Sequence, residues 1–327
     1  MTPALSTCWN SHRHKNGLAM VEEILALGFE RIELGHGMPA TLFQGVLEAR
    51  KIHRFSVGSV HNFLPSPVEI RADDPDCYEF TSHRPADRER AVRLTRTTVD
   101  WAEKLEAPFV VVHCGRIRSL DLTAGLRELV AEGKFLGREY VRRKLAAVQK
   151  RERVAEVYLQ RVLECLTEVV DYAGTKGVRI GIENREYHEA VPTERELVTF
   201  LRRLDSAHAG YWHDFGHAQI KHNLGLIDHR QWLEAAAPLA LGCHVHDVKW
   251  PFRDHCAPFT GEIAFENLLP LFPKSCAMVF ELSPRTPVEE VASASSCRDQ
   301  LPICSAIKSK LGRAAGSVSM HCAARLE

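Results

Sequence analysis

Carboxylates and histidines stand at the ends of several short apolar runs in this chain. One such run ends in Asp214, and His217 follows three residues later across a glycine. A strand end followed by a helix start could aim both side chains at one point, an arrangement that suits a metal ion. The same pair also fits a plain turn with a helix cap, because Asp is a favoured capping residue. The choice between these interpretations depends on what the other runs carry.

Eight apolar runs rich in β-branched or aromatic residues alternate with longer segments of helical period. This alternation is typical of parallel strands joined by crossover helices. We predict strands at residues 4–8, 29–34, 55–61, 109–113, 178–183, 209–214, 241–246 and 277–282. The predicted fold class is α/β, a single (β/α)8 TIM barrel over residues 1–300, since such a barrel with insertions fits a chain of 327 residues.

Helices are expected between these strands, at residues 16–27, 39–53, 87–105, 193–204, 231–237 and 265–271, with a last one from 287. Two further helical stretches, 119–132 and 136–173, exceed what one crossover needs and predict a helical insertion after the fourth strand. Its basic middle is either a solvated face or a surface for phosphates. The long loop 62–85 suggests a binding role. Residues 301–327 are expected to form a loosely attached C-terminal tail.

The composition limits the classes of partner. Lys plus Arg and Asp plus Glu number 42 each, so the net charge is zero. Without a global field, nucleic-acid binding is disfavoured although not excluded. No apolar run approaches the roughly 20 residues of a membrane span, and the N-terminus lacks the pattern of a signal peptide. Ten scattered cysteines without a Cys-x-x-Cys pair suit a reducing compartment. We expect a cytoplasmic protein with no membrane partner.

Strand parity predicts where the ionisable side chains point. In the fifth strand Val178, Ile180 and Ile182 share one row, so Glu183 belongs to the row that faces the barrel axis. The same reasoning turns an ionisable group inward at the end of each strand from the third to the eighth: His61, His113, Glu183, Asp214, His244 and Glu281. Barrels of this type hold their chemistry at that mouth, and clustered carboxylates repel unless a cation compensates them. Mixed N and O ligands favour Zn²⁺, Mn²⁺, Fe²⁺ or Co²⁺.

Six stretches, in their order and spacing, resemble the xylose isomerase-like TIM barrels over about residues 4–290. They are Ser59–Asn62, Val112–Gly115, Gly181–Arg185, His213–His217, His244–Val248 and Phe280–Leu282. This family includes sugar and sugar-phosphate isomerases and epimerases, inosose dehydratases and AP endonucleases of the endonuclease IV type.

The resemblance implies a metal ion held by Glu183, Asp214, His244 and Glu281. In the seventh strand the family spacing His-x-x-Asp selects His244, with Asp247 as the acid, and leaves His246 as the fallback. The endonuclease branch implies two further metals, with ligands on His61, His113 and His217 and on an Asp-x-His pair. Here that pair reads Asp254-His255 with no intervening residue. One to three divalent ions are therefore expected.

The isomerase and epimerase branches imply proton exchange beside a carbonyl by Glu183 and Glu281 as catalytic residues. His217, Arg185, His246 and Lys249 are the candidates for contacting a small sugar-like substrate. A metal-dependent isomerase or epimerase of a sugar or sugar phosphate is the leading hypothesis. The alternatives are an AP endonuclease or phosphodiesterase, a dehydratase or lyase acting on a keto-polyol, and a non-catalytic metabolite-binding barrel. The sequence leaves the substrate, the metal and the choice between monomer and homodimer open.

Overall fold

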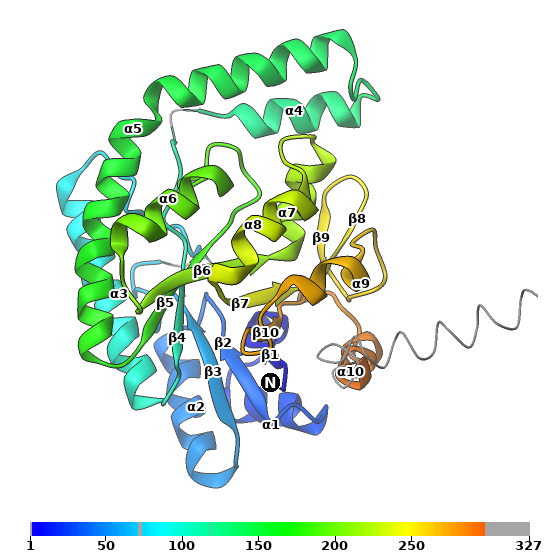
Figure 1. The fold of residues 1–327 in the computed structure, drawn as a ribbon. Helices are drawn as coiled ribbons and strands as arrows, with labels where there is room; N and C mark the ends of the chain where they lie inside the picture. Colours follow the sequence, from blue (N-terminus) through cyan, green and yellow to red (C-terminus); the bar gives the residue numbers. More distant parts are fainter. Residues whose placement is uncertain (1, 71–73, 119, 298–327) are drawn as a thin grey trace, which may run out of the picture.

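Eight parallel strands close into a barrel in the computed structural model, which describes residues 2–70, 74–118 and 120–297. Around the barrel the order is β1-β10-β7-β6-β5-β4-β3-β2 (Figure 1). The strands are β1 Ala4–Ser6, β2 Arg31–Leu34, β3 Ser56–His61, β4 Phe109–Val112, β5 Arg179–Glu183, β6 Ala209–Asp214, β7 Ala240–Val245 and β10 Ala277–Phe280. The predicted (β/α)8 fold is confirmed. The predicted tail, 301–327, lies outside the described residues.

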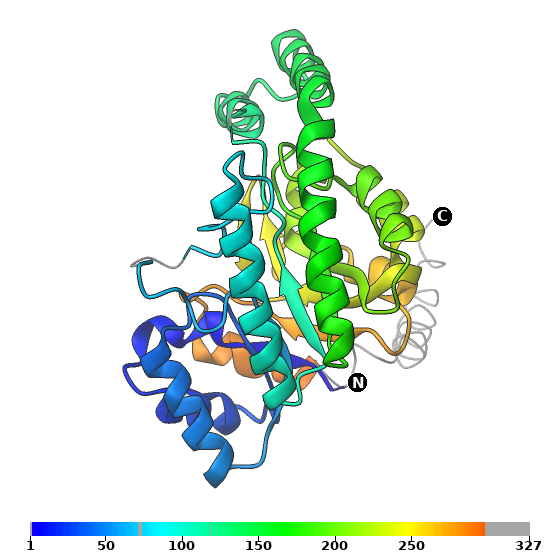
Figure 2. The ribbon, with the colours of Figure 1, turned by 90° about the vertical axis from the view of Figure 1, so that its left-hand side faces the viewer.

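Helices cover the outside of the barrel. They are α1 Gly17–Ala26, α2 Ala40–Ile52, α3 Pro85–Lys104, α4 Leu122–Ala131, α5 Arg138–Thr175, α6 Glu194–Leu204, α7 Phe215–Asn223, α8 His229–Ala236, α9 Phe265–Leu268 and α10 Val288–Cys297. The insertion after β4 consists of α4 and the first half of α5, and Figure 2 shows both projecting beyond the barrel. None of the described helices is long and apolar enough to cross a membrane.

A hairpin follows the seventh strand of the barrel, in a segment where the sequence predicts no strand. Strands β8 Asp247–Lys249 and β9 Arg253–Cys256 form an antiparallel hairpin there. The buried Asp247 carboxylate organises it, because its two oxygens accept hydrogen bonds from the backbone N–H groups of Val248, Gly261 and Ile263. The resemblance implies that Asp247 is the acid of the His-x-x-Asp spacing, and in the structure its carboxylate holds this backbone.

Several strands end earlier than predicted, and their terminal functional side chains stand in the following turn. β4 ends at Val112, β7 at Val245 and β10 at Phe280, so His113, His246 and Glu281 lie just beyond the backbone ladders. The β10–β7 and β4–β5 pairs keep an unbroken register up to these points, and the shift in the β6–β7 pair lies earlier, between Tyr211 and Trp212. The predicted parity is therefore unaffected.

The barrel interior is a small apolar plug that confirms the inward rows. Its members are Ala4, Phe109, Val111, Trp212, Ala277 and Val279. Gly181 and Gly242 flank the Trp212 indole on the adjacent strands, and a Cβ on Gly242 would lie 2.2 Å from a ring atom. Trp212 in turn lies edge-to-face against His244, with 5.5 Å between ring centroids. The plug thus forms the floor of the polar mouth.

Candidate metal centre

Four predicted residues meet at the C-terminal end of the barrel. Glu183 ends β5, Asp214 ends β6, His244 lies on β7 and Glu281 follows β10, and their potential ligand atoms all lie within 4.8 Å of one another. The Nδ1 atom of His244 is 3.2 Å from Glu183 Oε1, 3.2 Å from Glu281 Oε2 and 3.7 Å from Asp214 Oδ2. We call these four residues the primary cluster.

The chemistry of the primary cluster fits a divalent metal ion. Its members are at most 3% exposed, and three buried carboxylates so close together repel one another unless a cation lies between them. Burial would raise the pKa of Glu183, yet the charges of His244 and His113 and the hydrogen bonds from both hold that pKa well below its usual value. One imidazole nitrogen with carboxylate oxygens is a donor set typical of Zn²⁺, Mn²⁺, Fe²⁺ or Co²⁺.

Glu33 orients His244 and was missed by the sequence analysis. Its Oε2 atom lies 3.2 Å from His244 Nε2 and also accepts a 2.7 Å hydrogen bond from the Ser59 hydroxyl. With a metal ion bound, the proton of His244 would lie on Nε2 toward Glu33, and Nδ1 would offer its lone pair to the ion. A carboxylate behind a histidine is the usual support of a metal ligand. Strand parity could have found Glu33, since Ile32 and Leu34 point outward on either side of it.

His246 supports Asp214 and stands outside the primary cluster. Its Nδ1 accepts the backbone N–H of His255 at 2.9 Å, so its proton lies on Nε2, which donates to Asp214 Oδ2 at 2.9 Å. The structure thus places His244 among the three carboxylates and His246 behind one of them. His246 also lies within ligand distance of His255 and Glu281.

A second buried group shares Glu183 with the primary cluster. The Nε2 atoms of His61 and His113 lie 3.2 and 3.1 Å from Glu183 Oε2. Their Nδ1 atoms are held by the backbone carbonyl of Asn62 at 3.0 Å and by Asp76 Oδ1 at 2.8 Å. An imidazole fixed at one nitrogen, with the other turned to a shared carboxylate, suits a metal ligand.

Arg185 places a positive charge beside this second group. Its Nη1 lies 2.8 Å from His113 Nε2, and its Nη2 lies 3.8 Å from Asp76 and 3.7 Å from Glu186. Burial would lower the pKa of Arg185, but Glu186 and Asp76 raise it, so the guanidinium stays charged. A fixed cation here competes with a second metal ion for the same histidine.

The Asp214–His217 pair is both a helix cap and part of the mouth. Asp214 Oδ1 accepts the backbone N–H of His217 at 2.6 Å and so caps α7, while Oδ2 faces the primary cluster. The His217 ring donates from Nδ1 to the Asn184 carbonyl at 2.9 Å, and its Nε2 lies 3.5 Å from Glu186 Oε2. Glu186, also missed, stands three residues after Glu183 in the same stretch.

The β8–β9 hairpin brings the Asp254–His255 pair to the mouth. Asp254 Oδ1 lies 3.2 Å from His255 Nδ1, and His255 Nε2 lies 3.7 Å from Glu281 Oε2. The His255 ring stacks on His246 with centroids 4.1 Å apart. Lys249 is exposed and lines a cavity of about 380 Å³ together with Asp254 and His255.

Cys8 and His36 were not predicted. They lie within ligand distance of Glu281, and the Cys8 thiol is 3.5 Å from Glu281 Oε1. Cys8 ends the predicted first strand on the row of the inward Ala4, so parity could have found it, whereas His36 shares the outward row of Ile32 and Leu34 and reaches the site only through the turn after β2.

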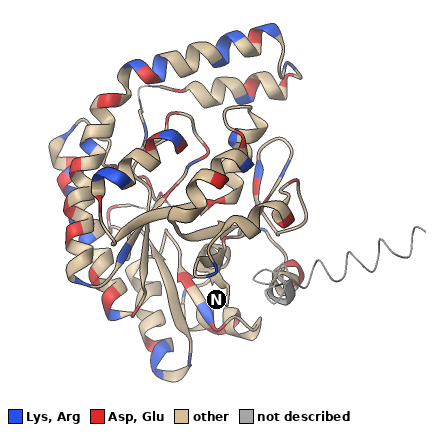
Figure 3. Ribbon diagram, in the orientation of Figure 1, with Lys and Arg blue, Asp and Glu red and all other residues tan. Residues whose placement is uncertain are grey.

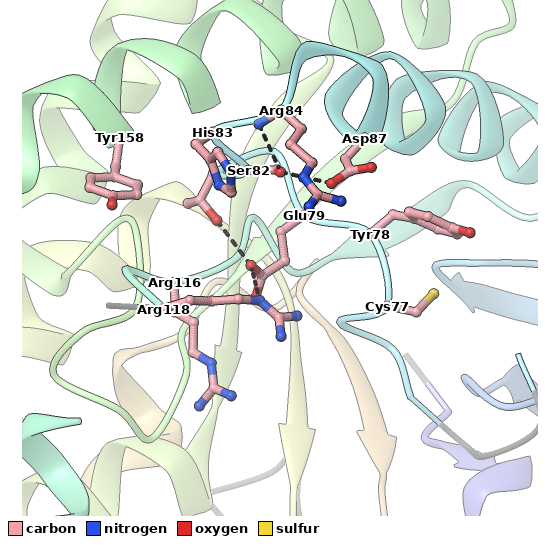
Figure 4. A pocket seen from close by; sticks show the side chains of 11 residues that line it. Cys77, Tyr78, Glu79, Ser82, His83, Arg84, Asp87, Arg116, Arg118 and Tyr158 are labelled. Carbon is pink, nitrogen blue, oxygen red and sulfur yellow. Dashed lines mark hydrogen bonds and ion pairs between the residues drawn. The ribbon is translucent and has the colours of Figure 1, made fainter. Parts of the chain in front are cut away.

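A separate cavity of about 550 Å³ opens beside the mouth, lined by the loop before α3 and the segment after β4. Figure 4 shows Arg118 beside Glu79, with 2.7 Å between Nε and Oε2, and the Ser82 hydroxyl beside Asp87, 3.1 Å from Oδ2. These charged groups therefore have partners within the wall of the cavity.

The comparisons with known proteins agree with this architecture. A family model described as the xylose isomerase-like TIM barrel matches residues 21–275. The chain belongs to this family. A comparison with curated proteins gave no match.

Solved structures of this xylose isomerase-like fold resemble the chain along most of its length. A D-tagatose 3-epimerase-like protein has a TM-score of 0.66 at 18% identity, covering 93% of this chain and 98% of that one. D-psicose 3-epimerase from Clostridium cellulolyticum H10, solved with D-tagatose, has a TM-score of 0.63 at 13% identity, covering 92% and 99%. The IolI protein, solved with a zinc atom, has a TM-score of 0.64 at 14% identity, covering 93% and 98%. At these identities the likeness shows the fold alone.

A buried chain of hydrogen bonds lies behind Asp214 and supports the mouth of the barrel. Gln219 Oε1 lies 3.0 Å from His229 Nδ1, His229 Nε2 lies 3.1 Å from His213 Nε2, and His213 Nδ1 lies 2.6 Å from the Tyr211 hydroxyl. The nitrogen pair between the two rings has room for a single proton, so at least one of the two imidazoles is neutral. Burial, and next the charge of His222, lower the pKa of His229 to about 3.

The neutral His229 predicts a stability loss in mild acid. Its folded pKa of about 3 lies below the 6.5 of a free histidine, so the unfolded chain binds the extra proton as the pH falls through 6.5. The free energy of unfolding should then fall by up to about 1.4 kcal/mol per pH unit from this group alone. Urea unfolding between pH 7.5 and pH 4.5 measures it. His229→Gln should have a shallower pH dependence, and equal slopes in the two proteins would refute the assignment.

Proposed function

We propose that this protein is a divalent-metal-dependent isomerase or epimerase that moves a proton on the carbon beside a carbonyl of a small sugar-like substrate. The observation that carries the proposal is the primary cluster, in which Glu183 and Glu281 stand in one buried site on strands separated by β6 and β7. Sugar epimerases among the structural neighbours support the substrate class.

The proposed roles follow from the geometry. Glu183, Asp214, His244 and Glu281 would hold the ion, whose charge stabilises the oxygens of an enediolate. Glu183 and Glu281 reach the site from different strands, so one carboxylate accepts the proton from carbon while the other returns it. The Nε2 atom of His217, with Glu186 beside it, is placed to bind a substrate hydroxyl.

Proton exchange in deuterated water tests the proposal. Metal-loaded protein incubated with ketoses and ketose phosphates should incorporate deuterium at the carbon beside the carbonyl, followed by NMR. Glu183→Gln and Glu281→Gln should each slow incorporation by roughly 100-fold or more, the range expected for a general acid-base group. Glu48→Gln, an exposed change on α2, is the matched control. Absence of exchange with every sugar would remove this function, and product analysis would separate isomerisation from dehydration or lysis.

Glu33→Gln should weaken metal binding without touching the metal site directly. The amide can no longer accept a full charge-assisted hydrogen bond from His244 Nε2, so the ring loses part of its orientation and basicity. Loss of such a support typically lowers metal affinity 10- to 100-fold, here estimated as roughly 10-fold. Chelator competition measures the affinity. Ser59→Ala, which removes only the hydroxyl partner of Glu33, should have a smaller effect, and the reverse order would contradict the assigned tautomer.

A metal-dependent phosphodiesterase or AP endonuclease is the second candidate, favoured by the group of His61, His113 and Glu183. Two observations rank it lower. Arg185 Nη1 lies 2.8 Å from His113 Nε2, and Figure 3 shows acidic and basic residues interspersed along the α5 ribbon. A neutral protein needs a basic stripe to hold a phosphate backbone.

Counting metals separates these two functions. Elemental analysis of purified protein should give one transition metal per chain for the isomerase, and His113→Ala should leave that number unchanged. Two or three ions per chain, together with cleavage of abasic-site DNA that His113→Ala abolishes, would establish the phosphodiesterase instead. If the protein neither exchanges deuterium into sugars nor cleaves abasic-site DNA, and a metabolite co-purifies with it, a metabolite-binding protein would be indicated.

A further inference from the structure

The helical insertion is anchored to the loops of the mouth. At the start of α4, the Thr123 hydroxyl donates to Glu189 Oε2 at 2.6 Å and accepts the backbone N–H of His188 at 2.8 Å. On α5, Arg151 makes two bonds to Glu196, at 2.6 and 2.7 Å, and the Tyr140 hydroxyl donates to the Leu224 carbonyl at 2.7 Å. These contacts tie the insertion to the loop after β5 and to the end of α7.

The insertion also meets the β8–β9 hairpin from the opposite side of the mouth. Phe135, between α4 and α5, lies edge-to-face against Trp250 with centroids 5.6 Å apart. In Figure 1 the hairpin reaches toward the turn between α4 and α5. The insertion therefore bridges two loops that follow catalytic strands, the β5 loop and the β7 hairpin.

Arg127 of α4 sits at this bridge. Its Cζ atom lies 5.7 Å from the ring centroid of Tyr187, in the loop after β5, and 5.2 Å from that of Phe252, in the hairpin. Arg116 contacts the Tyr187 ring as well, with its Cζ 5.2 Å from the centroid. Two guanidinium groups thus gather on one aromatic ring beside the mouth.

One edge of the Arg127 guanidinium has no acceptor within the part of the chain that the structure describes. Its Nε and Nη2 atoms are buried, and among the described residues neither has a hydrogen-bond partner. These two atoms form a single side of the planar group, the fork that matches both oxygens of a carboxylate or phosphate. The contacts with the two aromatic rings stabilise the positive charge, but they do not provide hydrogen-bond acceptors for the N–H groups. A buried N–H group without an acceptor is unfavourable. A ligand that supplies two anionic oxygens would satisfy both.

The loop after β5, between Glu183 and Tyr187, carries other polar atoms without a hydrogen-bond partner among the described residues. Tyr187 follows Arg185 and Glu186, and in the described part of the chain Arg185 Nε and Glu186 Oε2 also lack hydrogen-bond partners. Glu186 Oε2 lies 3.5 Å from His217 Nε2, which borders the cluster through Asp214. Unpaired donors and an acceptor suited to hydroxyl groups therefore follow Glu183 along the loop that leads to Tyr187, the ring that Arg127 contacts.

We propose that Arg127 binds an oxyanion at the far end of the substrate, so that the substrate is a sugar phosphate or a sugar acid and not a neutral sugar. The identity of the reacting end rests on the proposed function. The oxyanion site itself does not, because it is defined by the unpaired fork and its aromatic neighbours.

Binding of inorganic phosphate tests the site without catalysis. Isothermal titration of the metal-loaded protein with phosphate should give a dissociation constant that Arg127→Gln weakens roughly 10- to 100-fold, the range of charge-assisted hydrogen bonds. Arg127→Lys should be intermediate, since it keeps the charge and loses the fork. Arg138→Gln, an exposed change on α5, is the matched control. Unchanged phosphate binding in Arg127→Gln would overturn the proposal, and if that variant does not fold, the Lys variant decides by the same comparison.

Deuterium exchange then separates this proposal from the proposed function. Wild-type protein should exchange ketose phosphates or keto sugar acids faster than their neutral counterparts, and Arg127→Gln should remove the difference. The two acidic panels show whether phosphate or carboxylate is bound. If neutral sugars exchange faster, or if Arg127→Gln leaves the exchange rates unchanged, the proposal of an acidic substrate would be overturned. The proposed isomerase activity would be unaffected by that result. Arg127-dependent phosphate binding without any sugar exchange would support the oxyanion site and remove the isomerase.

Discussion

Mutual repulsion among buried carboxylates is the constraint on which the mouth of this barrel depends. Glu183 divides its two oxygens, with Oε1 toward His244 and Oε2 toward His61 and His113. Glu281 and Asp214 add two more buried charges beside it. Such a group is destabilising without a compensating cation, so the fold must hold it by other means. His244 and His113 beside Glu183 serve this purpose, because their positive charges lower its pKa although burial raises it, and His246 donates a hydrogen bond to Asp214.

Sequence reasoning was strongest where side-chain direction follows from a rigid rule. Alternation along a strand has a fixed period, so parity alone brought Glu183, Asp214, His244 and Glu281 to one end of the barrel, and the structure places them together. The rule would also have found Glu33, had it been applied to the second strand. Its success does not depend on strand boundaries, because His113 and Glu281 face the mouth although the ladders end before them.

The residues that parity could not find lie where the backbone is irregular. Asp76 reaches His113 from a long loop, Glu186 reaches His217 from the turn after β5, and His255 arrives on a hairpin held by Asp247. Each position is set by contacts between residues far apart in sequence. The same holds for the insertion: its helices followed from their periodicity, but its docking depends on pairs such as Arg151 with Glu196. In the basic middle of α5 only Arg151 is buried and structural, whereas most of the other basic residues are exposed, as the interpretation as a solvated face predicts.

The strands hold the carboxylates, whereas the insertion and two loops hold Arg127, and this difference affects how the substrate of such a barrel can change. The carboxylates are held by strands whose inward residues pack on one another, so altering them disturbs the core. Arg127 and its aromatic neighbours belong to the insertion and to two loops, and they contact the barrel through a few hydrogen bonds and rings. Substitutions there can change which group is bound at the far end of the substrate while the reacting end stays fixed. Barrels with variable loops permit this arrangement, in which the rigid strands carry the reacting groups and the inserted helices determine which substrate is bound.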